Sequence, residues 1–390
     1  MERTMEAREL FVDDKYAIAI TSMKKLGDKL YLGLTGGPRC LASYDIAGDE
    51  IVMENEIFPW IEGRGYCGKI HNAMGAMGED SLLIGEGNHF TWDGIPVAYN
   101  YLSKELPESM LYRKRQQGYP DAKFTDFCLP DLSNWDRRTS DPGGKIIKYG
   151  TKDGTVEVLC SLPDYLYVQA MATDPARQRA YGCTIPDNHF FSLDLKSGTL
   201  TDYGHISDYA NHNLVVTPDG RCRGAWIDRS DGSMKLLQFD PDRDRLEYSN
   251  TVILKDPGAK IAGNLGIDQW LVTRDGKVYM GTVANSLLFE FHFEEGIFEL
   301  LGQLAQGGRV TSMDEDEDGV IWIGAGYPNM HLVRFDPKAS GRGRLIDCGP
   351  VNSRYERCYF HASSYADGKL YLGETDGFSP SLHIIDLHQL

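Results

Sequence analysis

The stretch Asp367-Gly-Lys-Leu-Tyr-Leu-Gly373 recurs along the chain as a turn of aspartate and glycine, a short apolar strand with an aromatic residue, and a closing glycine. Close copies lie at residues 27–33 (GDKLYLG), 275–281 (DGKVYMG) and 318–324 (DGVIWIG), and weaker copies close at Gly85, Gly182 and Gly224. The seven closing glycines are 42 to 57 residues apart, apart from one gap of 97. Periods of about 40–50 residues with several short strands are typical of propeller blades. The repeat therefore predicts an all-β fold, a seven-bladed β-propeller.

The two ends of the chain suggest how this propeller closes. Residues 9–13 (ELFVD) precede the first blade, and the chain stops just after the third strand of the last blade. Because a propeller protects its sheet edges by closing, we expect residues 9–13 to supply the outer strand of the last blade. The prediction is one domain over 1–390, with an insertion at about 93–142 after the second blade's inner hairpin and a helix within 102–117.

Composition limits the partners of such a domain. The formal charge is −17, from 57 acidic and 40 basic residues, which argues against binding to nucleic acid or to an anionic membrane. No run of about 18 apolar residues is present, and the start of the chain has no apolar signal-peptide core. We expect a cytoplasmic protein, or a secreted or periplasmic one if a signal has been trimmed. The eight cysteines contain no CxxC pair, which favours reduced, buried thiols.

Counting back from the closing glycines shows what each inner strand presents to the propeller's channel. Twelve residues before the glycine lie polar or small residues in most blades, and blade two places His71 fourteen before Gly85. The other positions are Thr21, Ala170 (beside Gln169), His212, Gln269, Ser312 and His361. Ligands of propellers bind at the channel mouth. These residues are therefore either a functional ring or a structural polar lining.

A metal site is one interpretation of this ring. His212, Cys222 and His361 supply imidazole and thiolate groups, which suit Zn²⁺, whereas imidazole with Gln269 and water suits Mn²⁺. Ca²⁺ is a further alternative, and no organic cofactor is expected. Buried cysteines beside hydrogen-bonded histidines would give the same pattern without a metal.

Acid–base chemistry is the other interpretation. His71 and His89 flank one hairpin, Tyr167 enters the inner strand of blade three, and His189 follows that blade's next strand. Histidine and tyrosine can exchange protons with a bound substrate, although His189 also fits a structural turn. The expected substrate-binding residues are Arg64, Trp92, Arg113, Arg115, Trp135, Gln169, Asn188 and Gln269.

Several short motifs resemble the seven-bladed propeller polysaccharide lyases, in particular the ulvan lyases. They are GKIHNAMG (68–75), GEGNH (85–89), GGKIIKYG (143–150), ATDPARQRAYGCTIPDNHFFSLDL (172–195), GKLYLGETD (368–376) and SLHIIDL (381–387). The resemblance implies cleavage of a sugar chain next to a uronic acid by β-elimination, with His71 and His89 as the blade-two histidine pair. It also implies a zinc ion held by His and Cys, for which His212, Cys222 and His361 are the candidates.

The chain departs from that family in blade three. The positions expected for the family's catalytic tyrosine and arginine hold 169–171 (QAM) and Asp187 here. Tyr167 is therefore the nearest tyrosine, and an arginine must come from Arg64, Arg223 or the insertion. We therefore expect a polysaccharide or oligosaccharide lyase with channel-mouth histidines in acid–base or charge-neutralising roles. The alternatives are a metal-dependent propeller hydrolase and a noncatalytic propeller that binds sugar or protein.

Overall fold

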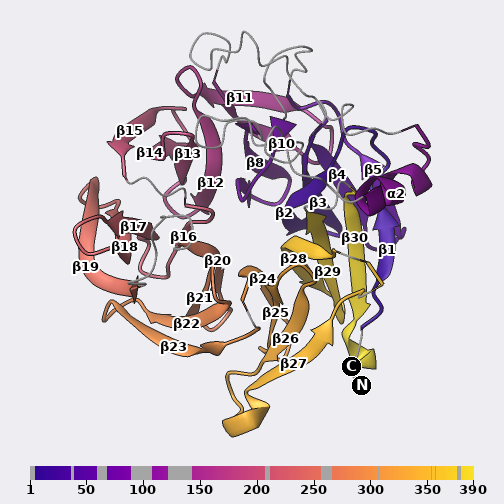
Figure 1. Cartoon of the computed structure of the whole chain (residues 1–390). Coiled ribbons are helices and arrows are strands. Elements are labelled where there is room, and N and C mark those ends of the chain that lie inside the picture. Colours follow the sequence, from indigo (N-terminus) through magenta and orange to yellow (C-terminus); the bar gives the residue numbers. More distant parts are fainter. Residues whose placement is uncertain are drawn as a thin grey trace. The chain divides into compact units, whose positions relative to one another are not determined.

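The computed structural model describes residues 5–36, 39–58, 68–88, 108–121, 143–206, 211–255, 266–305, 307–352, 354–355, 357–375 and 379–390. The chain is nearly all β, as predicted: antiparallel strands form seven sheets (Figure 1). The described helical parts are α2 (Glu108–Gln116) and the 3₁₀ segments η4 (Gly341–Gly343) and η5 (Leu387–Gln389). No helix in this part of the chain is both long and apolar enough to cross a bilayer.

Seven sheets in chain order are the seven blades. Blade one holds β2 (Ala19–Leu26), β3 (Lys29–Thr35), β4 (Leu41–Asp45) and β5 (Glu50–Met53), with β6 (Gly68–Lys69) and β9 (Gly87–Asn88) extending the sheet. Blade two holds β7 (Met74–Ala76), β8 (Ser81–Gly85), β10 (Lys145–Gly150) and β11 (Val156–Ser161). Blade three holds β12 (Tyr167–Asp174), β13 (Arg179–Ile185), β14 (His189–Asp194) and β15 (Leu200–His205).

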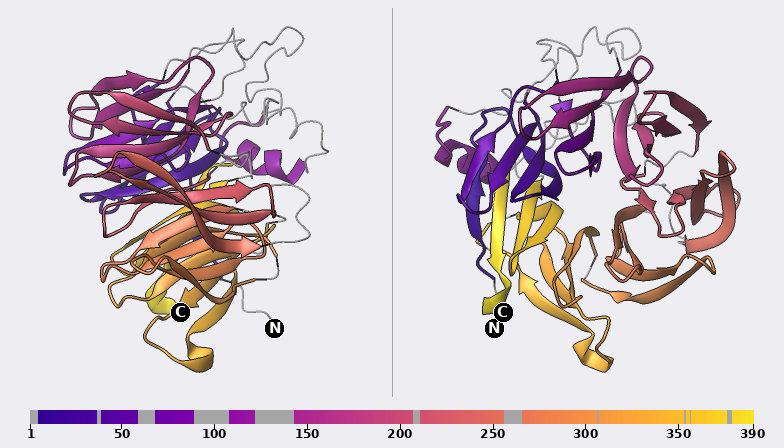
Figure 2. Two further views of the ribbon diagram at one scale, coloured as in Figure 1. Left: turned by 90° about the vertical axis from the view of Figure 1, so that its left-hand side faces the viewer. Right: turned by 180° about the vertical axis from the view of Figure 1, so that it is seen from behind.

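The remaining blades repeat this antiparallel order, and their twisted strands can be followed in both views of Figure 2. Blade four holds β16 (Val215–Val216), β17 (Cys222–Asp228), β18 (Ser233–Asp240) and β19 (Arg245–Lys255). Blade five holds β20 (Ile267–Val272), β21 (Val278–Thr282), β22 (Leu287–His292) and β23 (Ile297–Gln303). Blade six holds β24 (Arg309–Glu315), β25 (Ile321–Gly326), β26 (His331–Phe335) and β27 (Leu345–Pro350).

Blade seven confirms the predicted closure. Its strands β28 (Tyr359–Ala366), β29 (Lys369–Thr375) and β30 (Ser381–Asp386) are completed by the N-terminal strand β1 (Arg8–Phe11), in the order β1-β30-β29-β28. In blade two, β10 pairs with β8 in register, Ile147 opposite Ile84, although about 60 residues separate them in the sequence. The helix α2, within the predicted range 102–117, belongs to this intervening segment.

The chain forms two compact units, which are described separately. Unit 1 comprises residues 1–8, 203–372 and 384–390, and unit 2 comprises residues 9–202 and 373–383. The core of each unit lies between consecutive blades. In unit 2, for example, Ile70 and Ile84 of the second repeat pack with Tyr31 and Leu41 of the first, and all four are buried.

The closing glycines of the repeat have a packing role. A Cβ added to Gly33 would lie 2.8 Å from Ile70 Cγ2, in the next inner segment along the chain. Such a distance is too short for two carbon atoms, so only glycine lets the β-branched side chain sit against the backbone. The same relation holds for Gly85 with Val168, Gly281 with Val310 and Gly373 with Ile20. The sequence repeat therefore marks the contact between adjacent blades.

The residue after each of these β-branched side chains is polar, and in several blades it forms a β-bulge. Register shifts in the inner strands leave Thr21, Gln169, Asp268 and Thr311 without a direct partner on the neighbouring strand. Bulges re-aim side chains and are frequent next to functional sites. Thr21 Oγ1 donates to the Ile70 carbonyl at 2.8 Å, and Thr311 Oγ1 makes the equivalent bond to the Phe360 carbonyl.

Candidate functional site

A histidine, an aspartate and an arginine from three blades meet at the inner edge of unit 1. His212 precedes β16, Asp268 is the bulge residue of β20, and Arg309 begins β24. His212 Nδ1 lies 2.9 Å from Asp268 Oδ1. Arg309 donates from Nε to Asp268 Oδ2 and from Nη2 to Oδ1, each at 2.5 Å. We call these three residues the His–Asp–Arg cluster.

The charge of Asp268 fixes the protonation pattern of the cluster. Complete burial favours the neutral acid, but the charge and hydrogen bonds of Arg309 and then His212 outweigh it, and the pKa of Asp268 lies well below its usual range. An ionised carboxylate only accepts hydrogen bonds, so Nδ1 of His212 carries the proton. Arg309 Nη2, 3.1 Å from that nitrogen, therefore directs its hydrogen to the carboxylate. In the neutral ring the lone pair is on Nε2.

Solvent exposure separates the roles of the three side chains. Asp268 is fully buried, whereas 11% of the His212 side chain and 26% of the Arg309 side chain are exposed. A buried carboxylate behind a partly exposed imidazole holds the ring in one orientation and tautomer. The cluster can therefore offer an oriented imidazole nitrogen and a guanidinium to a bound molecule.

Gln269, a predicted substrate-binding residue, follows Asp268 on β20 and is half-buried. Its Oε1 accepts a hydrogen bond from Asn213 Nδ2, which comes directly after His212. That bond orients the amide of Gln269 so that Nε2 is its donor end. The structure thus brings Gln269 close in sequence and in space to the His–Asp–Arg cluster.

The predicted metal ligands are all in unit 1 and all buried. Cys222 begins β17, His361 lies on β28, and His212 contacts Asp268 through Nδ1. Among the described residues, no group of three ligand atoms within 4.8 Å of one another contains any of the three. The metal set therefore stays a prediction, and the described geometry does not itself form it.

In unit 2 the structure brings His71 and Gln169 together. His71 Nδ1 lies 2.8 Å from the backbone carbonyl of Gln169, the bulge residue of β12. Because a carbonyl only accepts, Nδ1 again carries the proton. Both side chains are buried, and Gln169 Nε2 has no hydrogen-bond partner within the described ranges. Tyr167, at the start of β12, is fully buried against Ile185.

The other blade-three residues lie where β14 begins, Asn188 just before the strand and His189 as its first residue. Asn188 is buried with a φ of 35°, and His189 is half-exposed. The His189 backbone N–H donates to Thr184 Oγ1 at 2.9 Å, and its Nδ1 lies 2.9 Å from Asp202 Oδ2. These contacts give His189 a structural role in the hairpin, and its catalytic role stays a prediction.

Several of the predicted catalytic and substrate-binding residues are not among those that the structure describes. His89, Arg64, Trp92 and Trp135 lie outside the described residues. Arg115 is half-buried on α2, and Arg113 on the same helix is buried against Glu374 and Glu9.

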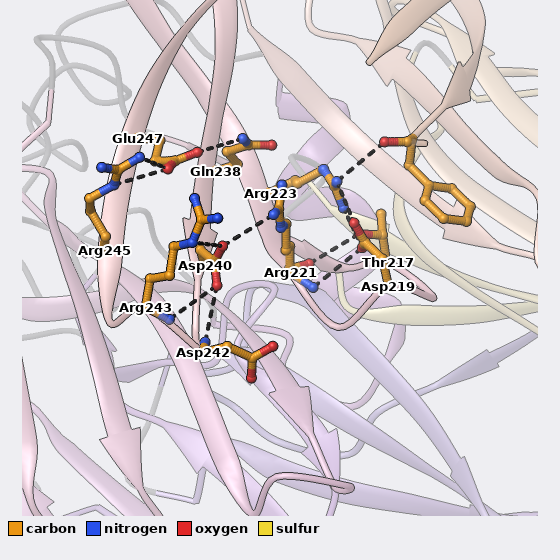
Figure 3. A network of polar contacts seen from close by, with 11 residues as sticks. Thr217, Asp219, Arg221, Arg223, Gln238, Asp240, Asp242, Arg243, Arg245 and Glu247 are labelled. Atoms are coloured by element: carbon orange, nitrogen blue, oxygen red, sulfur yellow. Dashed lines mark hydrogen bonds and ion pairs between the residues drawn. The ribbon is translucent and has the colours of Figure 1, made fainter. Parts of the chain in front are cut away.

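Arg223, which could have replaced the arginine of the lyase family, is also committed elsewhere. Its guanidinium makes two bonds to Asp219, at 2.7 and 2.8 Å, within the polar network of blade four (Figure 3). It also lies 5.3 Å from the ring centroid of Phe291, and its side chain is 2% exposed. Arg223 therefore stabilises blade four.

Sequence reasoning missed Asp268 and Arg309. Counting back from the closing glycine selected Gln269, one residue too late, because the bulge adds a residue to β20. A β-branched residue followed by a polar one, as in Ile267-Asp268, would have identified the inward position. Arg309 directly precedes the same kind of pair in blade six, Val310-Thr311.

No protein-family model matches the chain, and no curated protein matches it either. It is similar to solved structures at low identity. A catalytically inactive histidine-to-alanine variant of virginiamycin B lyase from Staphylococcus aureus, solved with quinupristin, has a TM-score of 0.59 and 8% identity, over 97% of this chain and 98% of that one. Oligogalacturonate lyase in complex with manganese has a TM-score of 0.57 and 11% identity, over 97% and 92%.

The extracellular domain of BT4673 from B. thetaiotaomicron has a TM-score of 0.57 and 14% identity over 98% of this chain, which spans only 40% of that one. These neighbours include two lyases and one protein that is not described as an enzyme. Likeness at such identities carries no information on substrate or chemistry. By its fold, the chain is a seven-bladed β-propeller.

Proposed function

We propose that this propeller is a carbon–oxygen lyase that cleaves a polysaccharide or oligosaccharide next to a uronic acid by β-elimination. The observation that carries the proposal is the orientation of His212 by the buried, ionised Asp268, with Arg309 beside it. A lyase of this kind needs a base for a weakly acidic C–H group and hydrogen-bond donors for the charge that develops on the carboxylate. The cluster supplies both within unit 1.

The proposed steps assign one role to each group. His212 Nε2 removes the C5 proton of the uronate, and the electron pair of that C–H bond forms the C4–C5 double bond. The C4–O bond breaks, and the leaving glycosidic oxygen takes a proton from the imidazolium, so that the enzyme returns to its initial state. Arg309 and Gln269 donate hydrogen bonds to the uronate carboxylate and stabilise its developing negative charge. Asp268 is a positioning residue.

Two of the neighbours in fold are lyases. One lyase neighbour is inactive as a histidine-to-alanine variant, and the other acts on a uronate oligosaccharide and was solved with manganese. A divalent metal would supply further positive charge for the substrate carboxylate. Because the described residues form no three-ligand set at His212, each proposed step uses only groups of the chain.

The proposal is tested by incubating the protein with galacturonan, ulvan, alginate and glycosaminoglycans, each with and without a chelator. The expected result is a rise in ultraviolet absorbance on at least one substrate, because elimination creates an unsaturated uronate. Loss of that rise with chelator would add a metal to the site. Flat absorbance on every uronate polymer, with or without added Mn²⁺ or Zn²⁺, would contradict the proposal and favour a hydrolase or a noncatalytic sugar- or protein-binding propeller.

A further inference from the structure

One arginine of α2 bonds to three strands of blade seven. Arg113 Nη2 donates to Glu374 Oε2 on β29 at 2.6 Å, and Nη1 donates to Oε1 of the same carboxylate. Nη2 also bonds to Glu9 on β1 and, at 3.3 Å, to Ser381 Oγ on β30. The side chains of Arg113 and Glu9 are 6% exposed and that of Glu374 is fully buried. Figure 1 shows α2 beside β1 and β30.

Other side chains of α2 and of the residues just after it bond to the same part of unit 2. Lys114 is fully buried and donates from Nζ to the carbonyl oxygens of Ala17, at 2.8 Å, and Asp14, at 2.5 Å. Gln117 Nε2 donates to Ser379 Oγ at 2.8 Å. Just after the helix, Tyr119 donates to Asp13 Oδ1 at 2.8 Å. These partners lie either between β1 and β2 or just before β30.

The helix α2 is short and polar. Its nine residues, ESMLYRKRQ, are mostly polar, and a helix this short is not stable in isolation. The strand that it contacts, β1, has only four residues and forms the edge of its sheet. A bidentate arginine–carboxylate ion pair is among the stronger and more directional contacts in proteins. Each element therefore depends on the other, and the buried ion pairs connect them.

We infer that α2 is a clasp that fastens the N-terminal strand β1 to blade seven, with Arg113 as the residue that joins β1 to β29. Two carboxylates face this single guanidinium, and His383 Nε2 lies 2.7 Å from Glu374 Oε2, so Arg113 is the insertion's contribution to closure of the sheet. This inference is independent of the proposed function.

The test is hydrogen–deuterium exchange of the full chain carrying Arg113→Met. The apolar side chain keeps the bulk but removes the guanidinium from the buried Glu374 and Glu9, leaving His383 beside Glu374, which is strongly destabilising locally. Backbone amides of β1 should lose protection by about 100-fold or more, while those of β20 and β21 in unit 1 keep theirs. The matched control is Gln116→Met, three residues along the same helix, whose exposed side chain bonds to Tyr112 of α2 itself and which should leave exchange of β1 unchanged.

Unchanged hydrogen exchange of β1 in the Arg113→Met variant would overturn the inference. An increase in the exchange of β20 and β21 as large as that of β1 would overturn it too. If that variant does not fold, Arg113→Lys replaces it. Lysine keeps the charge but lacks the planar fork, so exchange of β1 should still increase selectively. Protection of β1 equal to that of the unmodified chain in Arg113→Lys would likewise overturn the clasp.

Discussion

Replacing Asp268 by asparagine tests the electrostatic account of the His–Asp–Arg cluster. The substitution keeps the shape of the side chain and removes its charge. Asp268 is fully buried and accepts from Arg309 through both oxygens and from His212. Removing one member of a buried ion pair leaves the other charge uncompensated and costs about 3–5 kcal/mol. The asparagine oxygen can still accept from one side, but its NH2 group faces a donor and cannot form a hydrogen bond with it.

The assay is urea unfolding of both proteins across pH. Because the folded pKa of Asp268 is lowered, its stabilisation is complete above the ordinary aspartate value of about 3.9 and is lost as pH falls through the folded pKa. The free energy of unfolding of the Asp268→Asn variant should therefore be lower by about 3–5 kcal/mol at neutral pH. The difference between the two proteins should become smaller only at acidic pH.

The matched control is Asp347→Asn in the same unit. Asp347 lies 2.9 Å from His331 Nδ1, but its side chain is 47% exposed. An exposed pair contributes about 1 kcal/mol or less, so this variant should remain near the stability of the unmodified chain. Equal losses in the two variants, or a loss below about 1 kcal/mol for Asp268→Asn, would refute the reasoning.

Three further predictions concern unit 2. Gly33→Ala places a Cβ 2.8 Å from Ile70, whereas Gly343→Ala in unit 1 meets nothing within 4 Å; thermal unfolding should show a loss of about 1–3 kcal/mol for the first only, and equal midpoints would contradict the packing role. Burial lowers the pKa of Lys114 to about 8. Between about pH 8 and about pH 10 the unfolded chain therefore binds more protons than the folded chain. Stability should rise with pH over that interval, and a rise that persists unchanged in Lys114→Met would contradict this assignment. His71→Ala leaves the buried Gln169 carbonyl without its donor and should cost about 1–3 kcal/mol in urea unfolding, and an unaltered midpoint would exclude a structural contribution.

The repeat sufficed to predict the seven blades and the closing strand, because turns, glycines and apolar strands are local features of the sequence. The glycines that end four of the copies have a physical reason that acts between blades, as Gly33 and Ile70 illustrate. The N-terminal strand followed from the need to protect a sheet edge.

The site was harder to predict because it depends on long-range pairs. His212 was identified, but its partners Asp268 and Arg309 are 56 and 97 residues away. A bulge moved the inward position by one residue, and spacing counted from the glycine could not show it. Arg113 was expected to contact substrate on the basis of its charge, and only the fold reveals that Glu374, 261 residues away, lies against it.

The measurement that tests the central claim most directly compares His212→Ala with His331→Ala on whichever uronate polymer the unmodified chain cleaves. His331 makes a similar contact with an aspartate but is exposed at the surface. Ultraviolet absorbance of the unsaturated product should show a kcat loss of about 100-fold to 10,000-fold for His212→Ala and little change for His331→Ala, both variants remaining folded. Full activity of His212→Ala would contradict the account.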